Sequence, residues 1–405
     1  MTAEADGKPQ WLLLLPCPPN ELTIQSLKVA YGPTLGEALR DASEQSVRSK
    51  AATVLDVGLA CDLLWTRSTS YKKHLFSLLY KLSCMICVDL RIDVLYDNDV
   101  DIRYFLFSRE SNKHAKTTAS SESGLENDVK NLALCNRPWT RVFSVQSEGC
   151  ETVLQQFLHC REELSGISNH QIQVSRLSGA LSMTVVEDCT LETAKWTNDA
   201  TVQHDSVAVG GTFDHLHAGH KLLLTVTALS CTTKPHNNSI LPRLTIGITG
   251  DTLLKEKQYK DHLEDWHQRQ ESVKSFLGDF LLLCAPHYSL RSTKVCTDAN
   301  ARDIIDLFDP GLEIRYVEIF DPFGPTITDP CITALVLSAE TRSGGAAVNK
   351  RRHEKGWQPL EVIEIGVLDA ENDADNGATD VKVQDFHHKL SSTQIRSRIH
   401  QKLTA

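Results

Sequence analysis

The sequence of 405 residues has no long apolar run and no excess of positive charge. Because no apolar stretch reaches about eighteen residues, no membrane span is predicted. The formal net charge is −10, so the chain as a whole repels nucleic acid, and any anion site must be built locally. With 41% hydrophobic residues, the chain is long enough for two or three globular domains with cores of their own.

Targeting signals and paired cysteine motifs are also missing. The first ten residues, MTAEADGKPQ, contain no arginine, and the run WLLLLP that follows is too short for a signal core, so we interpret it as a buried strand. The 12 cysteines are scattered, which is typical of reduced thiols. Cys84 and Cys87 lack the second pair of a zinc site and are predicted to be buried core thiols. We expect a cytoplasmic protein and leave a mitochondrial association open.

Polar segments divide the chain into two regions. Residues 108–131 have the composition of a flexible loop or linker, and a weaker boundary falls at 194–206. We therefore expect an N-terminal region of unknown function at 1–200 and a second domain at 205–405. A further acidic segment, 369–382, is predicted to be a solvated loop before a final helix.

Strands and helices are suggested in both regions. The first region contains strand patterns at 53–65 and 90–107 and a helical pattern at 151–164, so we expect a less defined α/β region there. In the second region, strands alternate with helices, which predicts a Rossmann-like parallel sheet covered on both faces. One predicted helix carries Leu263, Trp266, Val273, Leu277 and Phe280 on a shared face. Residues 285–311 are longer than expected between a helix and a strand and resemble an insertion.

The stretch SVAVGGTFDHLHAGH concentrates groups suited to phosphate. Gly210 and Gly211 end an apolar strand and let backbone N–H groups approach an anion, and a helix expected from Leu216 directs its positive end at the same point. His217 and His220 are three residues apart and project from one face. Surface histidines beside a tight turn are the less favoured interpretation.

Two later segments are open to two interpretations each. In LSSTQIRSRI, Ser391 or Ser392 is a good helix N-cap, and Ile395, Ile399 and Leu403 form an apolar stripe, which favours a second phosphate cradle over a merely capped terminal helix. The basic run 350–352 is as consistent with phosphate binding as with a solvated helix face.

These motifs resemble a known family. GTFDHLHAGH is similar to the G-T-F-D-x-x-H-x-G-H signature of the nucleotidyltransferase superfamily. The motifs GITGDTLLKEK, FDPFGPTITDP, LSAETRSGGAAVNKRRHEKG and LSSTQIRSRI follow in the order seen in eukaryotic-type phosphopantetheine adenylyltransferases, the adenylyltransferase half of coenzyme A synthase. The resemblance covers about half the chain and does not reach residues 1–200. It implies adenylyl transfer from ATP to 4′-phosphopantetheine, giving dephospho-coenzyme A and pyrophosphate.

The resemblance also implies roles for individual residues. His217 and His220 contact the triphosphate, Thr212 holds the attacking phosphate, and Lys255 or Lys257 binds the acceptor phosphate, with Lys255 favoured. The remaining expected ATP contacts are Gly210, Gly211, Phe213, Ser391, Ser392, Thr393 and Arg396. Arg342 is a further substrate candidate. Mg²⁺ is expected only as the companion of ATP, without a metal site built by the protein.

Alternatives remain at the level of sequence. SSTQIR also resembles nicotinamide mononucleotide adenylyltransferases, and GTFDHLHAGH resembles cytidylyltransferases, but neither group shares the SAET block. A non-catalytic binding or scaffold protein is the other alternative, and the intact signature argues against it. The chain lacks the G-x-x-x-x-G-K-[ST] loop of a kinase. We therefore expect either dependence on a separate dephospho-coenzyme A kinase or a truncated product of a longer gene.

Overall fold

The computed structural model describes residues 8–60, 68–92, 100–109, 127–135, 137–165, 172–179, 203–232, 241–285, 287–298, 301–366 and 391–404. The chain is an α/β protein with two compact units, which comprise mainly residues 1–197 and 198–405. Within the ranges given, no helix is long and apolar enough to cross a membrane.

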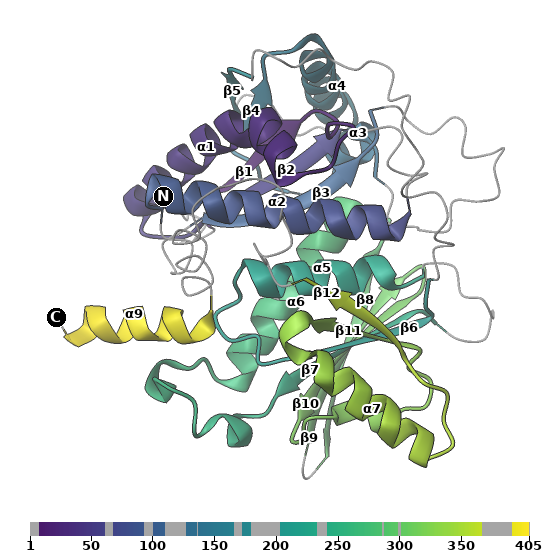
Figure 1. Cartoon of the computed structure of the whole chain (residues 1–405). Helices are drawn as coiled ribbons and strands as arrows, with labels where there is room; N and C mark the ends of the chain where they lie inside the picture. Colours follow the sequence, from purple (N-terminus) through teal and green to yellow (C-terminus); the bar gives the residue numbers. More distant parts are fainter. Residues whose placement is uncertain are drawn as a thin grey trace, which may run out of the picture. The chain divides into compact units, whose positions relative to one another are not determined.

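The first unit contains a five-stranded parallel sheet with the order β3-β2-β1-β4-β5 (Figure 1). Its strands are β1 (Gln10–Leu15), β2 (Thr53–Ala60), β3 (Val100–Phe107), β4 (Arg141–Val145) and β5 (Gln173–Leu177). The helices described between these strands are α1 (Ile24–Ser49), α2 (Thr69–Leu90), α3 (Val129–Leu134) and α4 (Glu148–Ser165). A capping box of Thr23 and Ser26 begins α1. The N-terminal region is therefore a regular α/β sheet.

Several predictions for this region are confirmed and one is wrong in part. The apolar run after residue 10 is the buried central strand β1, and Cys84 and Cys87 are buried on α2. The predicted helix at 151–164 lies within α4. Of the strand predicted at 90–107, residues Val100–Phe107 form β3, Leu90 belongs to α2, and residues 93–99 lie outside the described residues.

The predicted loop at 108–131 is ordered at both ends. Ser108 forms a parallel bridge with Asp128, and the Ser108 N–H donates to the Asn127 carbonyl at 2.9 Å. Asp128 then caps α3, which begins at Val129. Residues 110–126 of that segment, and the predicted acidic loop at 369–382, lie outside the described residues.

The second unit contains a seven-stranded sheet with the order β12-β11-β6-β7-β10-β9-β8. Its strands are β6 (Ser206–Gly211), β7 (Arg243–Thr249), β8 (Ser289–Asp298), β9 (Ala301–Asp309), β10 (Leu312–Ile319), β11 (Ala334–Ser338) and β12 (Glu361–Ile365). Its longer helices are α5 (Ala218–Ser230), α6 (Trp266–Cys284), α7 (Arg342–Glu354) and α9 (Ser392–Thr404). Short 3₁₀ helices are η4 (Asp251–Leu254), η5 (Lys260–His262), η6 (Gly324–Ile327) and η7 (Ala339–Thr341).

The predicted parallel sheet is confirmed, and two antiparallel strands extend it, so that the seven-stranded sheet is mixed. The five strands from β12 to β10 are parallel, but β9 is antiparallel to both β10 and β8. Both antiparallel strands come from the predicted insertion at 285–311. Only Pro310 and Gly311 separate β9 from β10, and so short a connection suits antiparallel neighbours, whereas parallel strands need a crossover.

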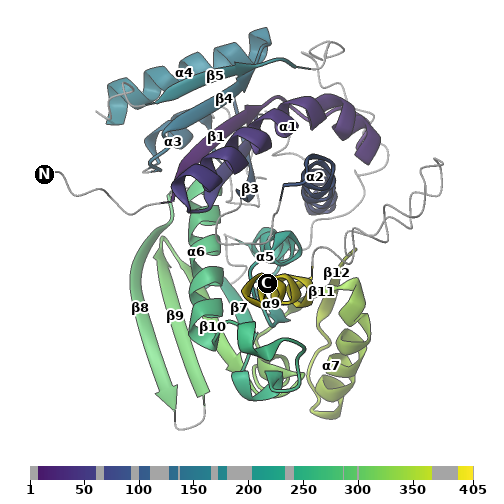
Figure 2. The same ribbon diagram turned by 90° about the vertical axis from the view of Figure 1, so that its left-hand side faces the viewer.

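The strand order defines where a ligand is expected. The chain passes from β6 to β7 on one side and later returns to β11 on the other side of β6, so the strand order reverses beside β6. In open α/β sheets, ligands bind at the carboxyl ends of the strands at such a point. Helix α6 packs beside β7 (Figure 2), and its predicted apolar face is buried at Trp266, Val273, Leu277 and Phe280. Leu263 precedes this helix.

Candidate active site

The turn after β6, residues 210–217, is called the signature turn below. Gly210 and Gly211 are the last two residues of β6, and a Cβ on Gly211 would lie 3.1 Å from the Phe213 ring. Phe213 and His215 both have positive φ, 54° and 47°. Non-glycine residues with positive φ are strained, so the surrounding structure must hold this turn in place.

His217 and His220 form a stacked pair at the start of α5. The helix begins at Ala218, two residues later than predicted, and His217 occupies its N-cap position without a side-chain capping bond. The two rings stack with centroids 3.9 Å apart, and the buried Nδ1 atoms of both have no hydrogen-bond partner among the described residues. Because buried polar atoms are normally bonded, two such nitrogens at a helix N-terminus suit an anionic ligand.

Both imidazoles are held in the neutral form. Both residues are partly buried. Burial, with smaller contributions from the charges of Lys221 and His215, lowers the pKa of His217 from 6.5 to about 3. Burial also lowers the pKa of His220 well below 6.5, with further contributions from His217 and His215. A neutral imidazole still carries one N–H donor, so the pair can bond phosphate oxygens without first burying a positive charge.

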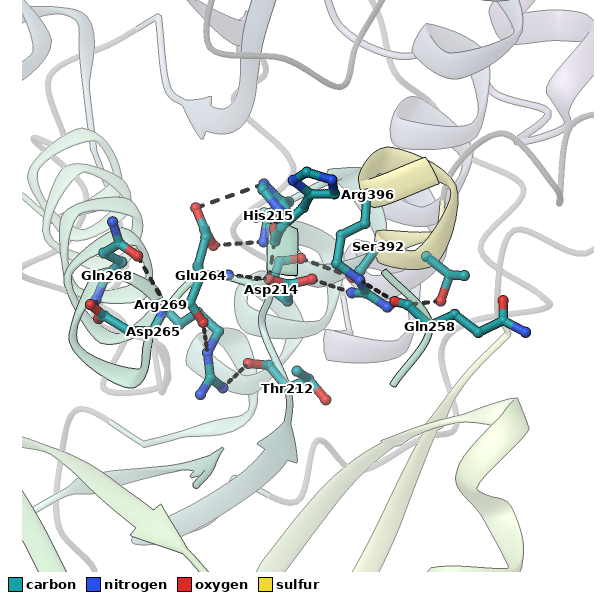
Figure 3. A network of polar contacts seen from close by, with 12 residues as sticks. Thr212, Asp214, His215, Gln258, Glu264, Asp265, Gln268, Arg269, Ser392 and Arg396 are labelled. Carbon is teal, nitrogen blue, oxygen red and sulfur yellow. Dashed lines mark hydrogen bonds and ion pairs between the residues drawn. The ribbon is translucent and has the colours of Figure 1, made fainter. Parts of the chain in front are cut away.

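A buried carboxylate joins the signature turn to two other segments (Figure 3). Asp214 accepts the Glu264 N–H through Oδ1 at 3.0 Å and pairs with Nη1 of Arg396 through Oδ2. The Ser392 hydroxyl donates to the Asp214 carbonyl at 2.8 Å, and Nε of Arg396 donates to the Gln258 carbonyl at 3.0 Å. These contacts tie the start of α9 to the signature turn and to the segment after β7.

The first turn of α9 brings the three predicted hydroxyl residues to this edge of the sheet. Ser391 occupies the N-cap position, because its hydroxyl accepts the Gln394 N–H at 3.3 Å. The Thr393 hydroxyl accepts from Nη2 of Arg396 at 3.1 Å. The predicted apolar stripe is buried only at Ile395, whereas the Leu403 side chain is 73% exposed. The stripe prediction therefore holds only for the first turn.

Arg396, one of the predicted ATP contacts, has a guanidinium that is bonded within the protein. Its side chain is only 2% exposed, and all three guanidinium nitrogens donate to protein acceptors. In this conformation, its contacts support the first turn of α9. A direct role toward ATP stays a prediction.

The two candidate lysines follow β7. Lys255 comes directly after η4, and Lys257 donates its backbone N–H to the Leu254 carbonyl at 3.0 Å. Both side chains are exposed. Because Gln258 is bonded to Arg396, the structure places both lysines on the segment that is joined to α9.

Arg342 and the basic run lie on α7. Arg342 is exposed and forms a two-pronged ion pair with Glu364 of β12, with Nε 2.6 Å from Oε2. This contact lowers the pKa of Glu364. Lys350 and Arg351 are exposed. Arg352 is buried and donates to several backbone carbonyls, so it supports the fold and is not a phosphate ligand in this structure.

Glu264 and Arg269 are contacts of the signature turn that the sequence did not reveal. Glu264 accepts the His215 N–H through Oε2 at 2.7 Å. Arg269 donates to the Thr212 carbonyl at 2.7 Å. Arg269 could have been found from the sequence, because it is a charged residue on the apolar face of a predicted helix, one turn from both Trp266 and Val273.

Comparisons with known proteins give two kinds of match. Residues 1–183 match a family described as "Domain of unknown function (DUF8446)". A phosphopantetheine adenylyltransferase from Pyrobaculum aerophilum is 34% identical over 194 residues, which cover 47% of this chain and 89% of that protein. The chain belongs to the phosphopantetheine adenylyltransferase family.

Two other members of this set of relatives are longer. An uncharacterized protein from Schizosaccharomyces pombe is 35% identical over 47% of this chain and 47% of its own length. A phosphopantetheine adenylyltransferase from Saccharomyces cerevisiae is 34% identical over 52% of this chain and 53% of its own length. This chain therefore spans about half the length of these two relatives, and the homology to phosphopantetheine adenylyltransferases indicates a nucleotidyltransferase relationship for part of the chain.

Proposed function

We propose that this chain transfers the adenylyl group of ATP to 4′-phosphopantetheine, giving dephospho-coenzyme A and pyrophosphate. The observation that carries the proposal is the stacked pair of His217 and His220 at the N-terminus of α5, whose buried Nδ1 atoms are unpartnered within the described part of the chain. A triphosphate supplies acceptors for such donors. The names of the relatives from Pyrobaculum aerophilum and Saccharomyces cerevisiae support the choice of acceptor.

The proposed chemistry needs alignment and charge stabilisation more than proton transfer. A phosphate oxygen of the acceptor attacks the α-phosphorus of ATP. The bond from that phosphorus to the oxygen bridging to the β-phosphate breaks, and its electron pair leaves with pyrophosphate. His217 and His220 donate hydrogen bonds where charge accumulates, and Thr212 orients the attacking phosphate. Lys255, or in second place Lys257, neutralises that phosphate.

A second set of donors surrounds the nucleotide. The backbone at Gly210 and Gly211 approaches the phosphates, and the Phe213 ring packs against His220 with centroids 5.4 Å apart. The first turn of α9 adds Ser391, Ser392 and Thr393. In this proposal Mg²⁺ arrives bound to ATP. Among the described residues, no three His, Cys, Asp or Glu side chains are grouped so that they could hold a metal ion.

A panel of donors and acceptors tests the proposal. The purified full chain is incubated with Mg²⁺ and ATP plus 4′-phosphopantetheine, with ATP plus nicotinamide mononucleotide, and with CTP plus phosphocholine. Pyrophosphate is measured and the products are resolved by mass. We expect pyrophosphate and dephospho-coenzyme A in the first mixture alone. A variant with both His217→Ala and His220→Ala, purified in the same way, controls for contaminating enzymes.

Each other outcome overturns a defined part of the proposal. Turnover with nicotinamide mononucleotide or with CTP alone would keep nucleotidyl transfer and replace the substrates. No turnover in any mixture, by protein that binds ATP, would favour the non-catalytic alternative.

A further inference from the structure

Arg269 is a buried cation on the apolar face of α6. Its side chain is 0% exposed, and its neighbours along the helix face, Trp266 and Val273, are buried as well. Burying a guanidinium costs several kcal/mol unless its charge and its donors find partners. A residue of this kind therefore depends on a specific set of acceptors.

The acceptors of Arg269 come from three segments, and Figure 3 shows two of them, at Thr212 and Glu264. Nη1 donates to the Thr212 carbonyl of the signature turn at 2.7 Å. Nη2 pairs with Oδ1 of Asp251 in η4 at 2.6 Å. Nε donates to the Glu264 carbonyl at 3.0 Å, just before α6. One rigid fork thus fixes the turn after β6 relative to the segment after β7.

The Thr212 carbonyl is a sensitive point in the signature turn. The next residue, Phe213, has a positive φ, and His215 has another. Such residues cost about 1–3 kcal/mol each and persist only where contacts hold them. Arg269 holds the turn at Thr212, while Glu264 holds it at His215.

We infer that Arg269 is a positioning residue for nucleotidyl transfer: it holds Thr212, and through the turn the histidine pair, in the geometry that the reaction needs. This inference rests on the proposed function. Its three guanidinium nitrogens donate to Thr212, Asp251 and Glu264, so it acts through them and does not touch the substrate. Near-attack geometry is demanding, and a misplacement of about 1 Å can cost roughly 10²-fold in rate.

Arg352 is a matched control. It is also buried, at 1% exposed, and its guanidinium also donates to backbone carbonyls, including Thr326 at 2.7 Å and Ile332 at 3.1 Å. Ile332 lies just before β11, at the amino end of that strand. Removing Arg352 therefore carries the stability cost of losing a buried guanidinium without touching the signature turn.

The experiment compares Arg269→Met, Arg269→Lys and Arg352→Met in the full chain. We expect Arg269→Met to lower kcat by about 10²-fold, with a smaller change in KM for ATP. Arg269→Lys should recover part of that loss, because an ammonium replaces the charge but not the fork. Arg352→Met should lower the melting temperature comparably and leave kcat within about threefold of wild type. Equal kcat losses in Arg269→Met and Arg352→Met would overturn the inference.

A second measurement does not depend on turnover. In protein with isotope-labelled histidine and no substrate, we expect the ring resonances of His217 and His220 to shift in Arg269→Met and to stay in place in Arg352→Met. Unshifted resonances in Arg269→Met would overturn the inference even if wild-type protein forms no dephospho-coenzyme A, an outcome that refutes the proposed function separately. If Arg269→Met does not fold, Asp251→Asn decides, since of the three contacts of Arg269 it weakens only the one at Nη2, although Oδ2 of Asp251 also accepts the Trp266 N–H at 3.3 Å. We expect shifted resonances there too, and unchanged ones would refute the inference.

Discussion

Acidification tests the electrostatics of the histidine pair directly. His217 has a pKa of about 3 in the folded protein, against 6.5 for an ordinary histidine. In an unfolded chain, the same ring takes up a proton as the pH falls through 6.5, whereas the folded ring stays neutral until the pH approaches 3. Because only the unfolded state gains the proton in this window, the contribution of His217 to stability is present above pH 6.5 and falls as the pH decreases.

The size of this effect follows from the pKa difference. A pH of 5 lies about 1.5 units below the pKa of the ring in the unfolded chain, so that ring is protonated, whereas the folded ring is still neutral. At about 1.4 kcal/mol per unit, His217 disfavours the folded state by about 2 kcal/mol relative to pH 7.5. This is an upper limit, because His217 is only partly buried and solvent reduces the desolvation. His220 acts in the same direction, since its pKa is also lowered.

Two measurements check this prediction. Ring resonances of labelled histidine, followed from pH 8 to pH 4.5, should show no titration of His217 or His220 near pH 6.5. Amide exchange in α5 should then reveal a larger loss of local stability between pH 7.5 and pH 5 in wild type than in His217→Asn, by up to about 2 kcal/mol. A midpoint near 6.5 for either ring would refute the argument that burial keeps the pair neutral.

Three further predictions concern single substitutions. His217→Ala and His220→Ala should each lower kcat by about 10²–10³-fold with an unchanged circular dichroism spectrum, since each removes a preorganised donor; near-normal turnover in both would remove the active-site assignment. Asp214→Asn should cost about 3–5 kcal/mol in urea unfolding of the second unit, because it breaks a buried ion pair; a loss below about 1 kcal/mol would contradict that account. Lys255→Met should raise KM for 4′-phosphopantetheine at least about tenfold. Lys257→Met is its matched control, and equal effects would contradict the preference for Lys255.

The parallel part of the second sheet was predictable because its strands are buried on both faces. β6, β7 and β11 are apolar runs bounded by polar turns, and such runs are the sequence signal of parallel strands. The hairpin of β8 and β9 could not be predicted from the sequence. β8 is exposed along most of its length, so its sequence shows no apolar alternation from which a strand could be identified.

In the first unit, the same limits apply to different elements. β4 and β5 have five residues each, and the sequence pattern of so short a strand is difficult to distinguish from that of a loop. Helix α1 contains Pro33, a residue that usually ends a helix, and its buried positions include Tyr31 and Leu35 on either side of that proline. Packing of the apolar face therefore prevails over the local signal at Pro33.

The residues of the candidate site also differ in how far they could be predicted: some lie in short local motifs, and others depend on contacts between distant segments. The histidines, the glycines and the serines lie in short motifs, so sequence alone located them. The pair of Arg396 and Asp214 could not be predicted, because the two residues are 182 positions apart and no local pattern indicates the contact. Once the charge of Arg396 is matched by Asp214, it cannot be counted as free positive charge for a triphosphate. Under the proposed function, attraction for the anion would then come from N–H donors at the start of α5 and α9, from neutral imidazoles and from the exposed lysines after β7, and a chain with a net charge of −10 would hold a polyphosphate through these local groups.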